Sequence, residues 1–135
     1  QSYVAEGLRF YDLALYDLAI FQFTNAVQID SNHALAYSWR AFSYYELGLY
    51  EQAILDLDQA ILLEPSPLHY YNLGAAYDKK GWYWQAILDY NNALLLDPTY
   101  AVAYVGRGNA YYRLDLTGRG REDWDTACRL DRLYC

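Results

Sequence analysis

The residues of this chain that could do acid–base or metal chemistry are few, and no spacing groups them. Acid–base catalysis needs groups held within hydrogen-bond reach of one reacting atom, whereas His33 and His69 fall near the predicted starts of two different helices. We expect His33 to be a turn residue and His69 a solvated residue at a helix start. The acidic residues are spread over turns and helix faces, so neither a metal site nor a cofactor is expected. The sequence therefore predicts that the chain is not an enzyme.

The two cysteines, Cys128 and Cys135, lie seven residues apart. In an unbroken helix such residues are separated by about 10 Å along the axis, which is too far for a disulfide. Three arrangements remain open: the chain turns back after Leu130 and joins the two cysteines, one cysteine bonds another subunit, or both are free thiols. Either bonded form would indicate an oxidising compartment.

A glycine- and arginine-rich segment at residues 117–121 is a third candidate for chemistry, because glycine loops can bind phosphate. The segment lacks the spacing of a phosphate-binding loop, in which a lysine and a hydroxyl follow the second glycine, and it follows no predicted strand. Two glycines weaken a helix by about 1 kcal/mol each relative to alanine. We therefore expect a degenerate terminal segment in which the last helix starts late or frays.

The composition excludes a membrane span and disfavours nucleic-acid binding. Of the 135 residues 55% are hydrophobic, yet no stretch approaches the roughly 20 uninterrupted apolar residues that a spanning helix requires. The formal net charge is −7, and residues 1–100 hold 4 Lys and Arg against 12 Asp and Glu. Nucleic-acid binding depends on neutralising phosphates with Lys and Arg, so proteins are the expected partners. The aromatic share of 19% indicates contact surfaces beyond an ordinary core.

An internal repeat organises the whole sequence. A tyrosine recurs at intervals of 34, 33 and 34 residues, as Tyr3, Tyr37, Tyr70 and Tyr104. Each tyrosine is followed by a small and then an aromatic residue: Gly7 and Phe10, Ala41 and Tyr44, Gly74 and Tyr77, Gly108 and Tyr111. The second half of each repeat places a large residue between two small ones: Ala19, Phe23 and Ala26; Ala53, Leu57 and Ala60; Ala86, Tyr90 and Ala93; Gly120, Trp124 and Ala127.

These residue types predict that each repeat is a pair of antiparallel helices. Small residues let two helices approach closely, and large residues fill the space opposite them. Pro65 and Pro98 stop the second helix, because proline cannot donate the next backbone hydrogen bond. Gly48 and Gly81 supply the turn between the two helices, and Asp115 stands at that position in the last repeat.

This pattern resembles the tetratricopeptide repeat, whose signature is matched by Tyr70, Leu73, Gly74, Tyr77, Ala86, Tyr90, Ala93 and Pro98. The resemblance covers essentially the whole chain and implies an all-α fold, a right-handed α-solenoid (superhelix) of four helix-turn-helix units. We expect these units at about residues 1–33, 34–66, 67–100 and 101–135, within a single domain, 1–135. Arg40 and Arg107 match a common bacterial form of the repeat, in which the aliphatic stem of the arginine lies on the neighbouring helix.

The resemblance also implies a concave groove lined by the first helix of each repeat. The residues expected to make contacts there are Leu35, Phe42, Tyr45, Leu68, Tyr71, Val105, Asn109 and Tyr112. Family members that recruit chaperone C-termini clamp a carboxylate with Lys, Arg and Asn on this surface, whereas only Asn72 and Asn109 are candidates here. A receptor for chaperone tails is therefore not expected.

The second helix of each repeat is expected to face outward, and there the sequence is apolar. The residues at these convex positions are Phe21, Leu55, Leu62, Trp84, Leu88 and Leu95. Two leucine pairs in this set are seven residues apart, so each pair shares one stripe of a helix. An exposed apolar patch marks an interaction site. The alternative is a different helix phase, in which the leucines are buried between repeats.

The preferred hypothesis is a non-catalytic interaction scaffold that self-associates head-to-tail, as a homo-oligomer or a filament subunit. It rests on the convex stripe, on the lack of a polar capping helix at either end of the sequence, and on the contrast between an acidic body and an arginine-rich last repeat. The alternative is a peptide-binding module or assembly factor that grips an apolar or aromatic segment in its groove. An extracellular location is favoured if Gln1 is a processed terminus, and a cytoplasmic one otherwise.

Overall fold

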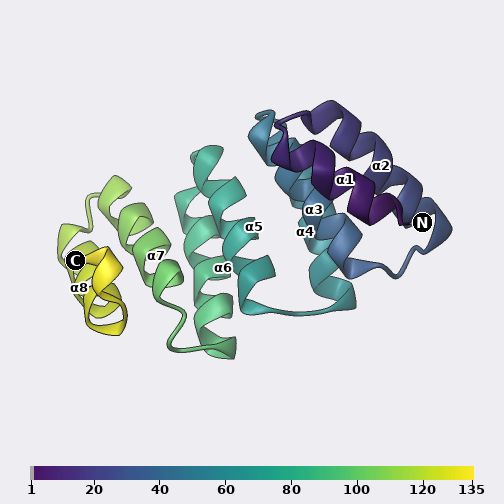
Figure 1. Cartoon of the computed structure of the whole chain (residues 1–135). Helices are drawn as coiled ribbons and strands as arrows, with labels where there is room; N and C mark the ends of the chain where they lie inside the picture. The colour runs from purple at the N-terminus through teal and green to yellow at the C-terminus, as the bar shows by residue number, and fades with distance from the viewer. Residues whose placement is uncertain (1) are drawn as a thin grey trace. The chain divides into compact units, whose positions relative to one another are not determined.

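The computed structural model describes residues 2–135, and within them it contains eight α-helices, one short 3-10 helix and no strand (Figure 1). The helices are α1 (Tyr3–Asp12), α2 (Tyr16–Ile29), α3 (Ala34–Glu46), α4 (Tyr50–Leu63), α5 (Pro67–Lys79), α6 (Tyr83–Leu96), α7 (Ala101–Arg113) and α8 (Thr117–Leu130), followed by η1 (Arg132–Tyr134). Odd-numbered helices are the first helices of the predicted repeats, and even-numbered helices are the second ones. The predicted all-α helical repeat is confirmed.

The turn inside each helix pair contains one residue in the left-handed backbone conformation. Its φ is 76° at Gly48 and 79° at Gly81, and it is 59° at Ala14 and 62° at Asp115. Glycine adopts this conformation without a steric penalty, whereas a residue with a Cβ pays roughly 1–2 kcal/mol. The repeat geometry therefore holds even where the sequence lacks the glycine that favours it.

The chain forms two compact units. Unit 1 ends at Pro65 and contains α1 to α4, and unit 2 spans Ser66–Cys135 and contains α5 to α8 with η1. Each unit thus consists of two helix pairs, and the division lies one residue before the predicted boundary between the second and third repeats. The single domain expected for residues 1–135 stays a prediction.

In three of the four helix pairs, a large side chain of the second helix packs onto a glycine of the first. In unit 2, Tyr90 is 1% exposed, and a Cβ added to Gly74 or to Gly106 would lie 2.7 Å from its ring. In unit 1, Phe23 is fully buried and lies against Gly7 in the same way. The glycines are required because a methyl group would collide with these rings.

The last helix does not start late, contrary to the sequence-based expectation. α8 begins at Thr117 and contains both Gly118 and Gly120. Gly120 is buried where α8 comes closest to α7, since a Cβ there would lie 2.8 Å from the carbonyl oxygen of Gly108. Tertiary packing between the two helices outweighs the low helix propensity of glycine.

Candidate functional site

The two histidines have structural positions. His33 is the N-cap of α3, and its Nδ1 accepts a hydrogen bond of 3.3 Å from the backbone N–H of Ala36. His69 is 6% exposed, so the expectation that it is solvated was wrong. It shares one face of α5 with the buried residues Asn72, Leu73 and Ala76, because these follow it by three, four and seven positions. Within residues 2–135, no three His, Cys, Asp or Glu side chains form a group that could hold a metal ion.

Two buried ion pairs form an equivalent structure in the two units. In unit 1, Arg40 donates to the carboxylate of Asp56 through Nε and Nη2, both at 2.7 Å, and through Nη1 to the hydroxyl of Thr24 at 3.2 Å. Arg40 thus contacts the residues sixteen positions before and after it, Thr24 of α2 and Asp56 of α4. The hydrogen bond to Asp56 raises the pKa of Arg40 despite the opposing effect of burial.

Unit 2 repeats this arrangement with one substitution. Arg107 donates to both carboxylate oxygens of Asp123, at 2.9 and 2.7 Å, and to the amide oxygen of Asn91 at 2.8 Å. The sequence-based expectation placed only the stems of these arginines on a neighbouring helix and missed their partners. The signal was present as an acid sixteen residues after each arginine, Asp56 and Asp123.

The net charge of the chain belongs entirely to unit 1. Residues 1–65 contain 9 Asp and Glu but only 2 arginines, whereas residues 66–135 contain 8 acidic and 8 basic residues. Both arginines of unit 1 are engaged inside it, Arg40 with Asp56 and Arg9 with Glu6 at 2.7 Å. Unit 1 therefore presents an acidic surface, and each of its two arginines is paired with a carboxylate of the same unit.

The six apolar residues expected on the outward faces of the second helices are all exposed. The exposed fractions range from 55 to 79%, for Phe21, Leu55 and Leu62 in unit 1 and Trp84, Leu88 and Leu95 in unit 2. They are not buried between repeats. Leu18 and Ile29 of α2 are exposed as well and extend the unit 1 surface, which the sequence analysis missed. We call these exposed apolar residues of the second helices the outer faces of the two units.

The residues expected in a groove all lie on first helices, three of them in unit 1 and five in unit 2. Leu35, Phe42 and Tyr45 belong to α3 of unit 1, while Leu68, Tyr71, Val105, Asn109 and Tyr112 belong to α5 and α7 of unit 2. Leu35, Leu68 and Tyr112 are about half exposed. The amide oxygen of Asn109 accepts a hydrogen bond of 2.9 Å from the indole of Trp124. Asn72 is buried, so it does not lie on a surface where it could clamp a carboxylate.

Four aromatic side chains of α1, α3 and the start of α2 form a continuous cluster, which we call the aromatic cluster: Tyr11, Tyr16, Trp39 and Phe42. The ring of Tyr11 lies 5.3 Å from Tyr16, 5.2 Å from Trp39 and 6.5 Å from Phe42, measured between centroids. The hydroxyl of Tyr16 donates to the carboxylate of Glu46 at 3.3 Å. Burial raises the pKa of Tyr11, and the carboxylates of Glu46 and Asp12 raise it further.

Unit 2 carries the opposite charge at the equivalent position. There, Nη1 of Arg113 donates to the hydroxyl of Tyr83 at 3.0 Å, and its guanidinium lies 5.7 Å from the ring centroid. Tyr83 and Arg113 each follow Tyr16 and Glu46 by 67 residues, or two repeats. Burial raises the pKa of the nearby Asp78, and the charge of Arg113 opposes this shift.

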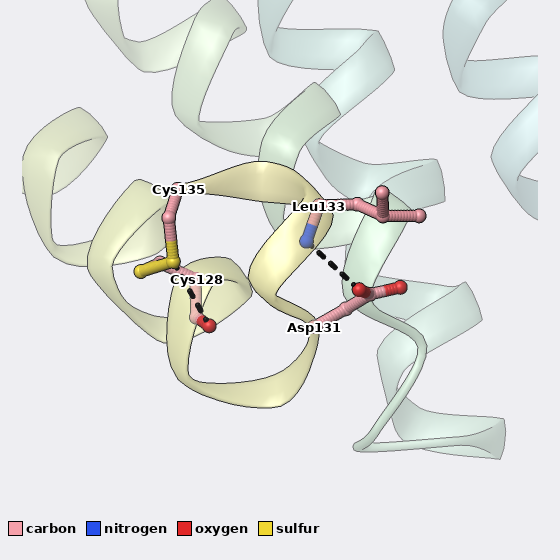
Figure 2. The surroundings of a disulfide bond; sticks show 4 residues. All are labelled: Cys128, Asp131, Leu133 and Cys135. Atoms are coloured by element: carbon pink, nitrogen blue, oxygen red, sulfur yellow. Dashed lines mark hydrogen bonds between the residues drawn. A yellow bond between two sulfur atoms is a disulfide. The ribbon is translucent and has the colours of Figure 1, made fainter.

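The two cysteines are joined to each other, with their Cα atoms 4.6 Å apart (Figure 2). The chain turns back after Leu130 because Asp131 starts a tight turn, in which its carboxylate accepts from the N–H of Leu133 at 2.9 Å. Of the three arrangements left open by the sequence, the structure has the bond within one chain. The same turn follows α6, where Asp97 accepts from the N–H of Thr99 at 3.0 Å.

Two family profiles match the chain. The family described as "TPR repeat" matches residues 79–115, and the one described as "Tetratricopeptide repeat" matches residues 34–67. Together the two matches cover more than half of the sequence. The chain belongs to the tetratricopeptide-repeat family. No curated protein sequence matches this tetratricopeptide-repeat chain.

Solved structures of tetratricopeptide-repeat proteins have the same fold. A crystal structure of MamA has a TM-score of 0.91 at 26% identity, and the match covers 96% of this chain and 77% of MamA. The Arabidopsis OM64 TPR domain has a TM-score of 0.78 at 25% identity, covering 82% and 92% of the two chains. The first TPR of Spaghetti (RPAP3), bound to the HSP90 peptide SRMEEVD, has a TM-score of 0.72 at 27% identity, covering 76% and 82%.

The tetratricopeptide-repeat chain is thus an all-α helical-repeat solenoid whose fold is that of a protein–protein interaction module. None of the helices in the described residues combines the length and the hydropathy that crossing a membrane requires.

Proposed function

We propose that this tetratricopeptide-repeat chain is a non-catalytic scaffold that associates with further copies of itself through its outer faces. The observation that carries the proposal is the exposure of large apolar residues on second helices in both units, such as Leu62 at 77% and Leu95 at 79%. Exposed apolar patches of this kind are typical of interaction sites.

The energy available is of the right size for a reversible contact. Burying a large apolar side chain contributes about 1.5–3 kcal/mol, so pairing Trp84, Leu88 and Leu95 of one copy with Phe21, Leu55 and Leu62 of the next contributes roughly 10 kcal/mol. Association costs about 4–15 kcal/mol in lost freedom. We therefore expect self-association that depends on protein concentration.

The charge distribution favours a head-to-tail orientation. Unit 1 has a net charge of −7, and the exposed arginines Arg119, Arg121 and Arg129 lie on α8 of unit 2. Contact between unlike surfaces of two copies leaves both remaining surfaces available, so the assembly grows into a ring or a filament. Such a contact weakens as the salt concentration rises, because salt screens exposed charges.

Light scattering and negative-stain microscopy over a range of protein concentrations test the proposal. Leu88→Glu should abolish the growth in mass, because it places a charge within the outer face of unit 2. The matched control is Leu13→Glu, since Leu13 is 67% exposed but follows α1 and lies outside the outer faces. A wild-type chain that stays monomeric at every concentration would contradict the proposal. Reductant should leave assembly intact, because both cysteines are bonded within the chain.

A second candidate function is peptide binding by the first helices. It is favoured by the half-buried aromatic residues Phe42 and Tyr71 on α3 and α5 and by the peptide held by the first TPR of Spaghetti (RPAP3). Under this function, Phe42→Ala or Tyr71→Ala weakens partner capture and leaves the oligomeric state unchanged. Variants of the outer faces should show the reverse pattern.

A further inference from the structure

The aromatic cluster of unit 1 lies beside a carboxylate and lacks a cation. Tyr16 touches Glu46 through its hydroxyl, and Tyr11 lies within the electrostatic range of Glu46 and Asp12. The arginines of this unit are Arg9 and Arg40, and each is paired with a carboxylate. Aromatic faces and a carboxylate together are the chemistry that binds an ammonium or guanidinium group.

Unit 2 shows how such a position accepts a cation. Two repeats further along the chain, Arg113 stands in place of Glu46 and places its guanidinium 5.7 Å from the ring of Tyr83. The fold therefore allows a guanidinium to bind a tyrosine at this place. In unit 1 the corresponding charge is negative, so a guanidinium there has to come from another molecule.

We propose that the aromatic cluster and Glu46 bind an arginine or lysine side chain of a basic peptide segment in a partner protein. This site is distinct from the outer faces through which the chain is proposed to self-associate, because Tyr11, Trp39, Phe42 and Glu46 lie on first helices and Tyr16 is the first residue of α2. The partner is basic because unit 1 carries 9 acidic residues and no arginine outside its two ion pairs. An acidic segment would be repelled.

The adjoining surface of α3 indicates what flanks the cation. Leu35, Trp39, Phe42 and Glu46 follow one another at intervals of four, three and four residues, so they form one stripe along the helix. Leu35 is 51% exposed at the far end of this stripe. A peptide that places its cation at Glu46 can therefore lay an aliphatic side chain on Leu35, which makes an arginine with a neighbouring leucine the preferred ligand.

The test is a titration of the full chain with a short capped peptide of arginine, leucine and alanine. The Leu88→Glu background keeps the chain monomeric, so peptide binding is measured separately from self-association. The indole N–H signal of Trp39, assigned with Trp39→Phe, reports binding by NMR. We expect a saturable shift that weakens with salt, because the contact is charge-dependent. A lysine peptide should bind at the same site.

Two variants distinguish direct binding of the cation by Glu46 from a general effect of the negative charge of unit 1 on peptide affinity. Glu46→Gln should weaken binding about tenfold, the loss expected for one cation–carboxylate contact at a partly exposed site. Asp58→Asn removes the same charge from α4 of the same unit, and it should change the affinity by less than about twofold. Glu46 is exposed, so Glu46→Gln is expected to leave the fold intact, and circular dichroism checks this.

Three outcomes overturn the proposal. The first is the absence of saturable binding by the arginine and lysine peptides. The second is equal binding by a peptide with citrulline in place of arginine, or by one with glutamate, since neither carries the cation. The third is loss of self-association in Glu46→Gln of the wild-type background while no peptide binds, because Glu46 would then contact another copy of the chain. Failure of self-association alone leaves the peptide site standing.

Discussion

Removal of the carboxylate of Asp56 should destabilise unit 1 strongly, because it leaves the guanidinium of Arg40 buried without its anion. The side chains of Arg40 and Asp56 are only 16% and 8% exposed, and two hydrogen bonds of 2.7 Å join them. Breaking a buried pair by removing one partner costs about 3–5 kcal/mol. We expect Asp56→Ala to lower the free energy of unfolding by this amount.

Replacing both Arg40 and Asp56 should lower the free energy of unfolding far less than replacing Asp56 alone. The third repeat has Leu73 at the position of Arg40, so the fold accepts leucine there. Well-packed apolar residues often replace a buried ion pair at little cost, and the double variant Arg40→Leu/Asp56→Leu should lie within about 1 kcal/mol of the wild type. The coupling energy between the two positions would then be at least about 2 kcal/mol.

Urea unfolding followed by the NMR signal of the Trp39 indole N–H measures this cycle, because Trp39 is the tryptophan of unit 1 and the other three belong to unit 2. The control is the pair Arg9 and Glu6, whose side chains are 76% and 43% exposed. Its removal should change stability by about 0–0.5 kcal/mol. The reasoning is refuted if Asp56→Ala costs less than about 1 kcal/mol, or if the double variant loses as much as the two single variants together.

Three further predictions concern the turns and the last helix. Gly120→Ala should destabilise the chain by about 1–2 kcal/mol, because the added Cβ would meet the carbonyl of Gly108. Gly118→Ala should stabilise α8 by up to about 1 kcal/mol, since a Cβ there meets nothing within 4 Å. Urea unfolding of the two variants compares these effects. Ala14→Gly should raise the free energy of unfolding by about 0.5–1 kcal/mol, since glycine adopts a φ of 59° without strain. Part of the gain is lost because glycine makes the unfolded chain more flexible. An unchanged midpoint of urea unfolding would contradict the prediction that Ala14 is strained. The hydrogen bonds from Thr99 lower the pKa of Asp97, so this carboxylate contributes stability above its unfolded pKa and the contribution is lost as the pH falls through its folded pKa. Thr99→Ala should raise the pKa of Asp97, which NMR titration of the carboxyl carbon would show.

The sequence predicts the fold well because the repeat columns are sterically paired. In each repeat the small residue of the first helix and the large residue of the second are sixteen positions apart, as Gly74 and Tyr90 are. In the structure Tyr90 packs onto Gly74. The exposure of Leu55 and Leu88 also follows from their helical phase.

The errors arose where a residue was judged by its neighbours in sequence alone. The start of α8 was misjudged because helix propensity is local, whereas Gly120 is held by the distant Gly108. The partner of Arg40 was missed because the residue type suggests a surface stem, and only the fold brings Asp56 beside it. Burial of His69 likewise depends on which face of α5 is covered.

The turn closed by the disulfide has a consequence for building longer arrays. Asp131 has a φ of −149° and a ψ of 116°, close to the −144° and 95° of Asp97, the residue that leads from α6 into α7. Cys128 and Cys135 occupy the repeat positions of Leu94 and Ala101. The chain therefore leaves α8 along the path by which one repeat passes into the next. With leucine and alanine in place of the two cysteines, a further copy of residues 101–134 can be joined at this point in register, which makes the helix pair a unit of modular construction.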